Sequence, residues 1–269
     1  MRGLLIYDSA GKARNEWFIG QLIKSAEALK CELELIVADD VSDFDTDVDF
    51  AIVRTINPSI NEYFENRGIP CFNNVKTSQI ANNKWLTYLF AKELGIPVMD
   101  TAKPKSAQEA IDTFAFPFVL KTVDGHGGSE VFLADNPDKC KELFSLFGED
   151  KLIIQKLSSE PGVDMRVYML GGKVLAAARR SSDTDFRSNF SLGGKAQIQD
   201  VPNEVSSIAE KICLELGAQL VGIDFIRHNG EWILNEIEDV VGTRMLYSLT
   251  ELDPAYLYVE RIINKLSKN

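Results

Sequence analysis

The sequence predicts two kinds of architecture in one chain, a small α/β unit at the N-terminus and a larger α+β region after it. The first seventy or so residues alternate short apolar runs with helical segments, which is the rhythm of a small parallel sheet. The later residues place strands on either side of glycine-rich turns, which favours antiparallel sheets. With 45% hydrophobic residues in a length of 269, the chain can fill a sizeable core.

In the N-terminal unit, strands are expected over residues 4–7, 33–37 and 50–53, with a helix over 16–30. A dinucleotide site is not supported, because the G-x-G-x-x-G fingerprint is missing after the first strand. The segment from Asp8 to Lys12 stands there instead, and Gly11-Lys12 is interpreted as a plain loop rather than a phosphate site.

The middle of the chain begins with a helical pattern over residues 74–94, and Gly95-Ile96-Pro97 ends it because proline cannot continue a helix. Two strands follow, over 117–122 and 130–134. The glycine-rich stretch 124–129 joins them, so a hairpin with a glycine tip is expected.

The last part of the chain reads as mixed α/β with antiparallel strands. Strands are expected over 152–157, 165–170 and 173–180, with Gly171-Gly172 as the turn between the last two. An amphipathic helix is expected over 208–216.

These patterns divide the chain into three expected domains. Residues 1–74 form an N-terminal α/β domain, residues 75–157 a central subdomain with the glycine-rich loop, and residues 158–269 a C-terminal subdomain with an acidic strand.

Charge and cysteine usage exclude several classes of protein. The 29 basic and 40 acidic residues give a net charge of -11, which disfavours nucleic acid as a partner. Four scattered cysteines with two histidines indicate neither a zinc site nor a disulfide framework. The apolar run Gly3–Tyr7 reaches Asp8 too soon for a signal peptide, and no window is long enough to span a membrane. A cytoplasmic protein with no membrane partner is expected.

Three acidic residues, Asp224, Glu236 and Glu238, form the strongest local pattern. Side chains two apart on a strand share a face, so Glu236 and Glu238 should lie together. Neighbouring carboxylates repel one another, and a hard divalent cation resolves that repulsion. An edge strand with one solvated face explains the pattern equally well.

The turn before these acids should have an odd length. A three-residue loop over His228–Gly230 pairs Asp224 with Leu234 and keeps the acids on one face. A two-residue turn without a compensating bulge would send Glu236 to the opposite face. A three-residue loop is therefore predicted.

Two further segments suit an anion. Lys121 precedes the glycine-rich loop, where backbone N–H groups can approach phosphate oxygens closely, although such a tip is more often a simple turn. His126, within this loop, is interpreted as a loop residue rather than a catalytic base. Arginines recur at 179–180 and 187, ahead of Gly193-Gly194-Lys195; the alternative is a solvated loop.

Several short motifs follow one another in a fixed order. They are Asn83-Lys84, Gly95-Ile96-Pro97, Val119-Leu120-Lys121, residues 124–128, residues 153–156, Asp164-Met165-Arg166, Arg179-Arg180, residues 185–189 with Gly193-Gly194, Gly222-Ile223-Asp224 and Glu236-Ile237-Glu238. With these motifs, the chain from about Asn74 onward resembles the ATP-grasp ligases, and within them the RimK-like group of ribosomal-protein glutamate ligases. Several motifs in the right order are more specific than any one alone.

The resemblance implies an ATP-grasp fold behind a small pre-ATP-grasp domain, with ATP and one or two Mg²⁺ ions, for which Mn²⁺ can substitute. It assigns the nucleotide to Lys84, Lys121, Gly125, Gly127, Gly128, Gln155, Lys156, Leu157 and Asp164. It assigns the metal to Asp224, Glu236 and Glu238. The γ-phosphate and the reacting carboxylate fall to Arg180, Arg187 and Asn189, and the substrate to Arg166 and Arg244.

The activity implied is a carboxylate–amine ligase that works through an acylphosphate. Its substrates would be the carboxylate of a small molecule or peptide and an amine or amino acid, and a homo-oligomer is compatible with this. A kinase of the same fold and a nucleotide-binding module without catalysis are the alternatives. The sequence departs from the family pattern at Lys156, usually acidic, at Glu238, usually Asn, and at Val241-Gly242, usually Pro-Gly.

Overall fold

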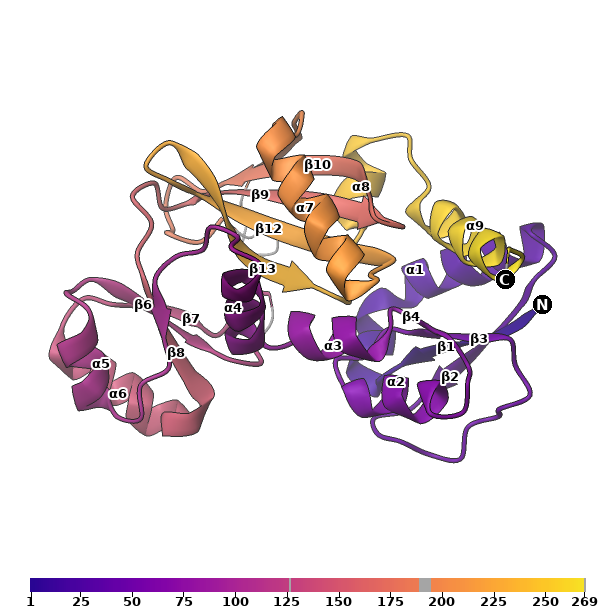
Figure 1. Cartoon of the computed structure of the whole chain (residues 1–269), viewed down its shortest axis with the longest axis horizontal. Coiled ribbons are helices and arrows are strands. Elements are labelled where there is room, and N and C mark those ends of the chain that lie inside the picture. The colour runs from indigo at the N-terminus through magenta and orange to yellow at the C-terminus, as the bar shows by residue number, and fades with distance from the viewer. Residues whose placement is uncertain (126, 189–194, 269) are drawn as a thin grey trace.

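The computed structural model describes residues 1–125, 127–188 and 195–268, which form three sheets with helices packed on them (Figure 1). The sheets follow one another along the chain, with strands inside residues 2–72, 101–156 and 163–238. The division of the chain at residues 74 and 157 stays a prediction. None of the described helices combines the length and the apolar character needed to cross a bilayer.

The first sheet is fully parallel and has the order β2-β1-β3-β4. Its strands are β1 (Arg2–Tyr7), β2 (Glu32–Val37), β3 (Phe50–Val53) and β4 (Cys71–Phe72). Both faces of β1 are buried, since Leu5 and Tyr7 pack on the side of helix α1 (Ser9–Ala28), and Leu4 and Ile6 on the side of α2 (Pro58–Glu65). Burial on both faces explains the continuous apolar run that predicted this strand.

Helix α1 begins earlier than expected, and the plain loop predicted at Gly11-Lys12 is wrong. The Asp8 side chain accepts a hydrogen bond from the Gly11 backbone N–H at 2.6 Å, which makes Asp8 the N-cap. Gly11 and Lys12 therefore lie in the first turn of the helix. A kink follows at Asn15, where φ is -124° and ψ is 19°.

The second sheet has the order β5-β8-β6-β7 and is antiparallel. Its strands are β5 (Thr101–Ala102), β6 (Phe118–Thr122), β7 (Val131–Ala134) and β8 (Leu152–Lys156). Helices α5 (Ala107–Thr113) and α6 (Pro137–Phe147) and the 3-10 turn η1 (Glu149–Lys151) complete this part, shown at the left of Figure 1. The hairpin predicted around the glycine-rich loop is confirmed by the pairing of β6 with β7.

The helix expected over 74–94 is two helices, α3 (Val75–Ala81) and α4 (Lys84–Glu93). Asn83 causes the break, because its side chain accepts hydrogen bonds from the backbone N–H groups of Trp85 and Leu86. As the N-cap of α4, Asn83 fixes Lys84 as the first residue of that helix.

The third sheet is antiparallel, with the order β11-β10-β9-β12-β13. Its strands are β9 (Val163–Leu170), β10 (Lys173–Ser181), β11 (Lys195–Ile198), β12 (Leu220–His228) and β13 (Glu231–Glu238). Along β9, Met165 and Val167 face helix α7 (Asn203–Leu216), whereas Asp164 and Arg166 face the other side of the sheet. One face of this sheet is therefore core, and the other carries charged groups.

The three-residue loop predicted between β12 and β13 is wrong. His228 pairs with Glu231, so the turn holds two residues, Asn229 and Gly230, with φ of 52° and 79°. Positive φ at both positions suits the Asn-Gly pair.

A β-bulge compensates for the short turn. Phe225 pairs with Leu234 but the next pair is Asp224 with Glu236, so Asn235 is the extra residue. The bulge, and not the predicted three-residue turn, therefore places Asp224 and Glu236 opposite one another on the same face of the sheet.

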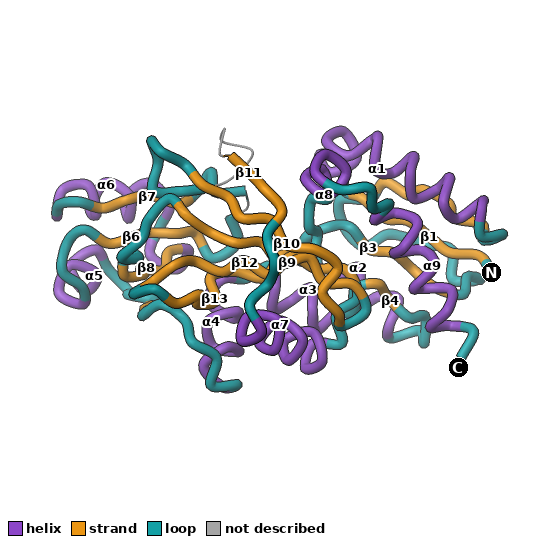
Figure 2. Tube along the Cα trace, turned by 90° about the horizontal axis from the view of Figure 1, so that it is seen from above, coloured by secondary structure: helices purple, strands orange, loops and turns teal. Residues whose placement is uncertain are grey.

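The C-terminal helices return to the first sheet. Helix α8 (Arg244–Leu249) lies close to α1. Helix α9 (Pro254–Leu266) packs against α1, as both views show (Figures 1 and 2). Tyr258, Val259 and Ile262 share one hydrophobic cluster with Leu5 and Phe18. The two ends of the chain are therefore joined through a common core.

The side chain of Asn73, which directly follows β4 of the first sheet, forms hydrogen bonds to residues at the ends of β12 and β13 in the third sheet. Its amide nitrogen donates to the Leu220 carbonyl at 2.8 Å and to Asp239 at 2.7 Å, and its amide oxygen accepts from the backbone N–H groups of Gln219 and Leu220. The side chain is buried, so no water replaces these bonds if it is lost.

We expect Asn73→Ala to lower the free energy of unfolding by about 2–4 kcal/mol, because it removes one of the hydrogen bonds to the buried Asp239 and the side-chain partner of the Gln219 and Leu220 backbone groups. Urea unfolding followed by circular dichroism measures the change. The exposed Asn66→Ala is the matched control and should change stability little. Equal stability of both variants would contradict the stabilising role of Asn73.

Candidate active site

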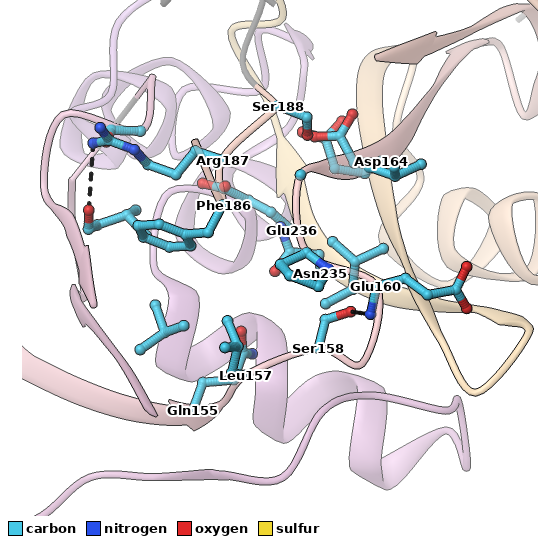
Figure 3. A pocket seen from close by; sticks show the side chains of 18 of the residues that line it. Gln155, Leu157, Ser158, Glu160, Asp164, Phe186, Arg187, Ser188, Asn235 and Glu236 are labelled. Carbon is cyan, nitrogen blue, oxygen red and sulfur yellow. Dashed lines mark hydrogen bonds between the residues drawn. The ribbon is translucent and has the colours of Figure 1, made fainter. Parts of the chain in front are cut away.

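A cavity lies between the second and third sheets, and it is lined by most of the residues predicted for the nucleotide, the metal, and the γ-phosphate with the reacting carboxylate (Figure 3). These are Lys121, Gly128, Gln155, Lys156, Leu157, Asp164, Arg180, Arg187, Asp224 and Glu236. In the close-up, Gln155 and Leu157 lie at one end, Asp164 and Ser188 at the other, and Asn235 between them. Segments far apart in the sequence thus meet at one site.

Lys84 joins the glycine-rich loop to the acidic strand. Its ammonium group donates a hydrogen bond to the Gly125 carbonyl and lies 3.1 Å from a carboxylate oxygen of Glu236. Gly127 and Gly128 have φ of 67° and 78°, a region that favours glycine, so the sequence of the loop tip suits its backbone. His126 lies outside the described residues.

Lys121 is a buried cation that lines the cavity. Its ammonium group donates to the Asn235 side-chain oxygen at 2.8 Å. Burial disfavours the charged form and lowers the pKa of Lys121 to about 8, although Glu236 acts in the opposite direction. An anionic ligand beside Lys121 would therefore stabilise the charged form of this lysine.

The bulge in β13 explains why consecutive residues both face this cavity. In a regular strand Asn235 and Glu236 would point to opposite faces, but both line the cavity here. The sequence prediction missed Asn235. An available signal was the Asn229-Gly230 pair, which favours a two-residue turn and hence requires a bulge if the acids share a face.

Strand register builds a chain of charges across the third sheet. Arg180 on β10 is opposite Asp164 on β9, and Arg166 on β9 is opposite Asp224 on β12. Both pairs are bidentate: Arg180 donates to Asp164 at 2.6 and 2.8 Å, and Arg166 to Asp224 at 2.8 and 2.7 Å. Arg180 also reaches Asp224 at 2.7 Å, and Arg166 forms an ion pair with Glu238.

All of these side chains are buried except Glu238, which is partly exposed. Burial opposes ionisation of Asp224, but Arg166 and Arg180 outweigh it and hold the pKa of that carboxyl below its ordinary value. At Glu238 burial prevails over the attraction of Arg166 and raises the pKa to about 7. The pKa values of two neighbouring carboxyl groups are therefore shifted in opposite directions, downward at Asp224 and upward at Glu238.

The predicted metal ligands share one sheet face, but each has a cation beside it. Asp224 is held by two arginines, Glu238 by Arg166 and Glu236 by Lys84. Within the described part of the chain, no three His, Cys, Asp or Glu side chains are gathered as a metal-binding group. The carboxylate oxygens of Asp224, Glu236 and Glu238 are nevertheless the type of ligand that Mg²⁺ prefers. Glu236 and Glu238 are more accessible than Asp224.

Arg187 fixes the glycine-rich loop from the opposite side. Its guanidinium pairs with Asp185 at 2.7 Å and donates to the Gly128 carbonyl at 2.9 Å. Asn189 and Gly193-Gly194, also predicted for this site, lie outside the described residues.

At the other end of the cavity, the ammonium group of the lining residue Lys156 lies 2.7 Å from Asp100 in an exposed ion pair. Gln155 turns inward to bond the Thr101 hydroxyl at 3.1 Å.

A larger cleft of about 970 Å³ lies between the first and third sheets. Asp8, Arg14 and Trp17 line it from the N-terminal side, and Glu238 and Arg244 from the C-terminal side. Arg180 lines both this cleft and the first cavity, so the two spaces meet at this residue.

Residues 81–262 match the sequence model of a protein family, that of the RimK-like ATP-grasp domain. The chain belongs to the RimK-like ATP-grasp family. A relative of this family, a probable alpha-L-glutamate ligase from Haemophilus influenzae, is 27% identical over 218 residues, covering 77% of this chain and 72% of its own.

Solved structures agree with the ATP-grasp fold, which is confirmed. A RimK domain protein from Sphaerobacter thermophilus has a TM-score of 0.77 at 16% identity and covers 98% of this chain and 100% of its own. D-alanine–D-alanine ligase from Bacillus anthracis has a TM-score of 0.79 at 16% identity, covering 100% and 98%. At these identities the likeness concerns the fold alone.

The buried Lys121 predicts a pH dependence for this RimK-like site. Nucleotide phosphates attract only the protonated lysine, whose pKa is about 8 in the free protein. As pH rises above 8, ADP affinity measured in EDTA should fall, by about tenfold for one charge-assisted contact.

Calorimetry between pH 7 and pH 9 measures this fall. Lys121→Gln should bind ADP more weakly and without the pH dependence. Lys156→Gln removes a lysine whose ammonium group faces solvent, and it should keep the wild-type pH profile. A wild-type affinity that stays constant over this range would contradict the role of Lys121.

Proposed function

We propose that this RimK-like ATP-grasp protein is an ATP- and Mg²⁺-dependent ligase that joins a carboxylate to an amine through an acylphosphate. The observation that carries the proposal is the meeting of the two spaces at Arg180. A site that transfers a phosphoryl group to a second substrate needs such a junction between nucleotide and acceptor. The similarity to the Haemophilus influenzae relative, a probable alpha-L-glutamate ligase, supports the ligase assignment and an amino acid as one substrate.

The nucleotide would occupy the cavity between the second and third sheets. Its phosphates would lie against Lys84 and Lys121 under the glycine-rich loop, and its adenine against the main chain of residues 155–157. In this proposal Asp164 contacts the ribose. Both of its oxygens accept from Arg180, so the contact requires an oxygen shared between the guanidinium and a hydroxyl.

Magnesium would be held by Glu236 and Glu238, with Asp224 joining them as Arg166 turns toward substrate. When bound, it supplies positive charge that neutralises the phosphates. Lys84, released from Glu236, would then serve the phosphates alone.

A carboxylate is a poor electrophile, so the proposed reaction first makes it a mixed anhydride. A carboxylate oxygen attacks the γ-phosphorus and ADP leaves; the amine nitrogen then attacks the carbonyl carbon, and phosphate leaves as the nitrogen loses a proton. The protein's part is to position the two substrates and to stabilise charge, through Arg180 and, in the proposal, Arg187 and Asn189. Arg166 and Arg244 would hold the acceptor.

The direct test supplies purified protein with ATP, Mg²⁺ and pools of amino acids or short peptides. We expect ADP and phosphate in equal amounts, together with a product whose mass is that of two substrates less one water. Mass spectrometry identifies the product. A stable phosphorylated compound without an amide would indicate the kinase alternative, and no turnover with any pool would contradict both enzymatic functions.

Glu238 provides a test of the metal site. A third carboxylate adds negative charge for a hard cation, so Glu238→Asn should need more Mg²⁺ for half-maximal turnover, on the order of fivefold. The variant should still fold, since Arg166 keeps its bidentate pair with Asp224.

The measurement is a Mg²⁺ titration of ATP turnover at fixed pH. Glu231→Gln is the matched control, an exposed acid on the same strand that does not line either space. Superimposable curves for wild type and Glu238→Asn would remove Glu238 from the metal site.

A further inference from the structure

The loop that joins the second sheet to the third forms one wall of the nucleotide cavity. It connects the end of β8 to the start of β9 and comprises residues 157–162, here called the connecting loop. Every residue of this loop except Ser159 lines the cavity. Ser158 and Glu160 are drawn there in Figure 3. The position of the connecting loop therefore shapes the space proposed for the nucleotide.

The tip of the β12–β13 hairpin holds the connecting loop through its main chain. Three hydrogen bonds join the Ser158 hydroxyl to the Arg227 carbonyl, the Asn229 N–H to the Ser159 hydroxyl at 2.7 Å, and the Gly230 N–H to a Glu160 carboxylate oxygen at 3.0 Å. In a two-residue turn the strand ladder does not use the N–H groups of the turn residues, so they are available to the loop.

A fourth hydrogen bond to the connecting loop comes from the side chain of His228. The Ser159 backbone N–H donates to His228 Nδ1 at 3.1 Å. A backbone N–H can only donate, so Nδ1 must be unprotonated. Nε2 then carries the proton of the neutral ring. It lies 3.2 Å from the Asn229 amide nitrogen, and a half-turn of that amide places its oxygen there as acceptor. The Ser159 bond therefore exists only with a neutral imidazole.

The far end of the connecting loop is fixed by main-chain bonds alone. The Gly162 N–H donates to the Phe186 carbonyl at 2.8 Å, and the Gly162 carbonyl accepts from the Ser182 N–H at 2.9 Å. A Cβ at Gly162 would lie 2.8 Å from the Ser182 carbonyl oxygen, so this approach requires glycine. These bonds contain no titratable group. The attachment to the hairpin differs, because it includes His228.

We propose that the neutral imidazole of His228 positions the connecting loop for the nucleotide, so that protonation of this imidazole weakens nucleotide binding. Protonation would put an N–H at Nδ1 opposite the Ser159 N–H and replace a hydrogen bond by repulsion. Neither His228 nor Ser159 lines the cavity, which makes His228 a positioning residue. The effect on the nucleotide rests on the proposed function, whereas the bond between His228 and the loop does not.

The matched variant for the test is His228→Asn, because an Asn Oδ1 can take the place of Nδ1 and accept from Ser159 at any pH. The charged groups around His228 are unchanged in this variant. They are Arg227 on the same strand, Glu231 opposite it, Glu160 of the loop, and Asp100 in its ion pair with Lys156.

Other groups of the cavity titrate in the same range of pH. Burial lowers the pKa of Lys121 to about 8 and raises the pKa of Glu238 to about 7. Both residues are present in wild type and in His228→Asn. The ratio of the two affinities at one pH therefore isolates the imidazole, the group that ordinarily changes charge between pH 5 and pH 8.

Calorimetry with ADP and Mg²⁺ at pH 8 and pH 5.5 measures the affinities. At pH 8, wild type and His228→Asn should bind ADP equally, and His228→Ala about fivefold more weakly. At pH 5.5, wild type should bind about fivefold more weakly than His228→Asn and should match His228→Ala. Ser159→Ala removes the acceptor of the Asn229 N–H, so it should weaken binding but keep the wild-type response to pH.

Hydrogen exchange followed by mass spectrometry observes the loop directly, in protein without nucleotide. The Ser159 N–H lies in a peptide that spans residues 157–162, and each variant is compared with His228→Ala at the same pH. We expect His228→Asn to protect this peptide at both pH values. Wild type should protect it at pH 8 and lose that protection at pH 5.5.

Two results would overturn the proposal: a ratio of wild-type to His228→Asn affinity that is the same at both pH values, or His228→Ala protein that binds ADP as tightly as wild type at pH 8. Loop protection that follows the charge of His228 without any change in ADP affinity would also count against the positioning role. If no protein bound ADP, wild type included, the nucleotide site of the proposed function would fail. The exchange measurement would then still decide whether His228 holds the loop.

Discussion

The structure depends most on the chain of ion pairs that crosses the third sheet. Asp164, Arg180, Asp224 and Arg166 are buried, and a buried charge without a partner is strongly destabilising. Cross-strand register places each arginine opposite a carboxylate, so the sheet can close only with β9, β10 and β12 in this alignment. A slip of one residue would put these charges beneath α7, in the apolar core.

The same constraint prepares the site for its ligands. Arg180 is fixed by three hydrogen bonds and still borders both spaces, so its position is set before any ligand arrives. Preorganised charge of this kind is effective because it need not be rearranged as the reaction proceeds. The bulge at Asn235 contributes similarly, since it turns two consecutive polar side chains toward one cavity without lengthening the turn.

The sequence predicted those elements whose signals are local. The N-terminal apolar run, the hairpin around the glycine-rich loop and the Gly171-Gly172 turn each follow from a pattern of a few residues. The start of α1 and the β12–β13 turn were predicted wrongly even though their signals were local: Asp8 is a strong N-cap and Asn229-Gly230 a strong two-residue turn. In the second case the need to keep the acids together was given more weight than the turn chemistry, and a bulge satisfied both.

The charge pairing itself could not be read from the sequence. Asp224 and Glu238 suggest a metal site when seen alone, and only the register shows Arg166 placed between them. The hydrogen bond from Arg244 to the Arg14 backbone carbonyl could not be predicted from the sequence either, because it forms only when the C-terminal helices pack against the first sheet.

Charge neutrality links the two halves of this site. Each predicted metal ligand has a basic partner, and the same bases are the groups that a nucleotide or a carboxylate would contact. Phosphates that draw Lys84 away from Glu236 would leave that carboxylate uncompensated, and a divalent cation restores the balance. Anion and metal should therefore favour one another's binding, because each removes the electrostatic cost that the other creates.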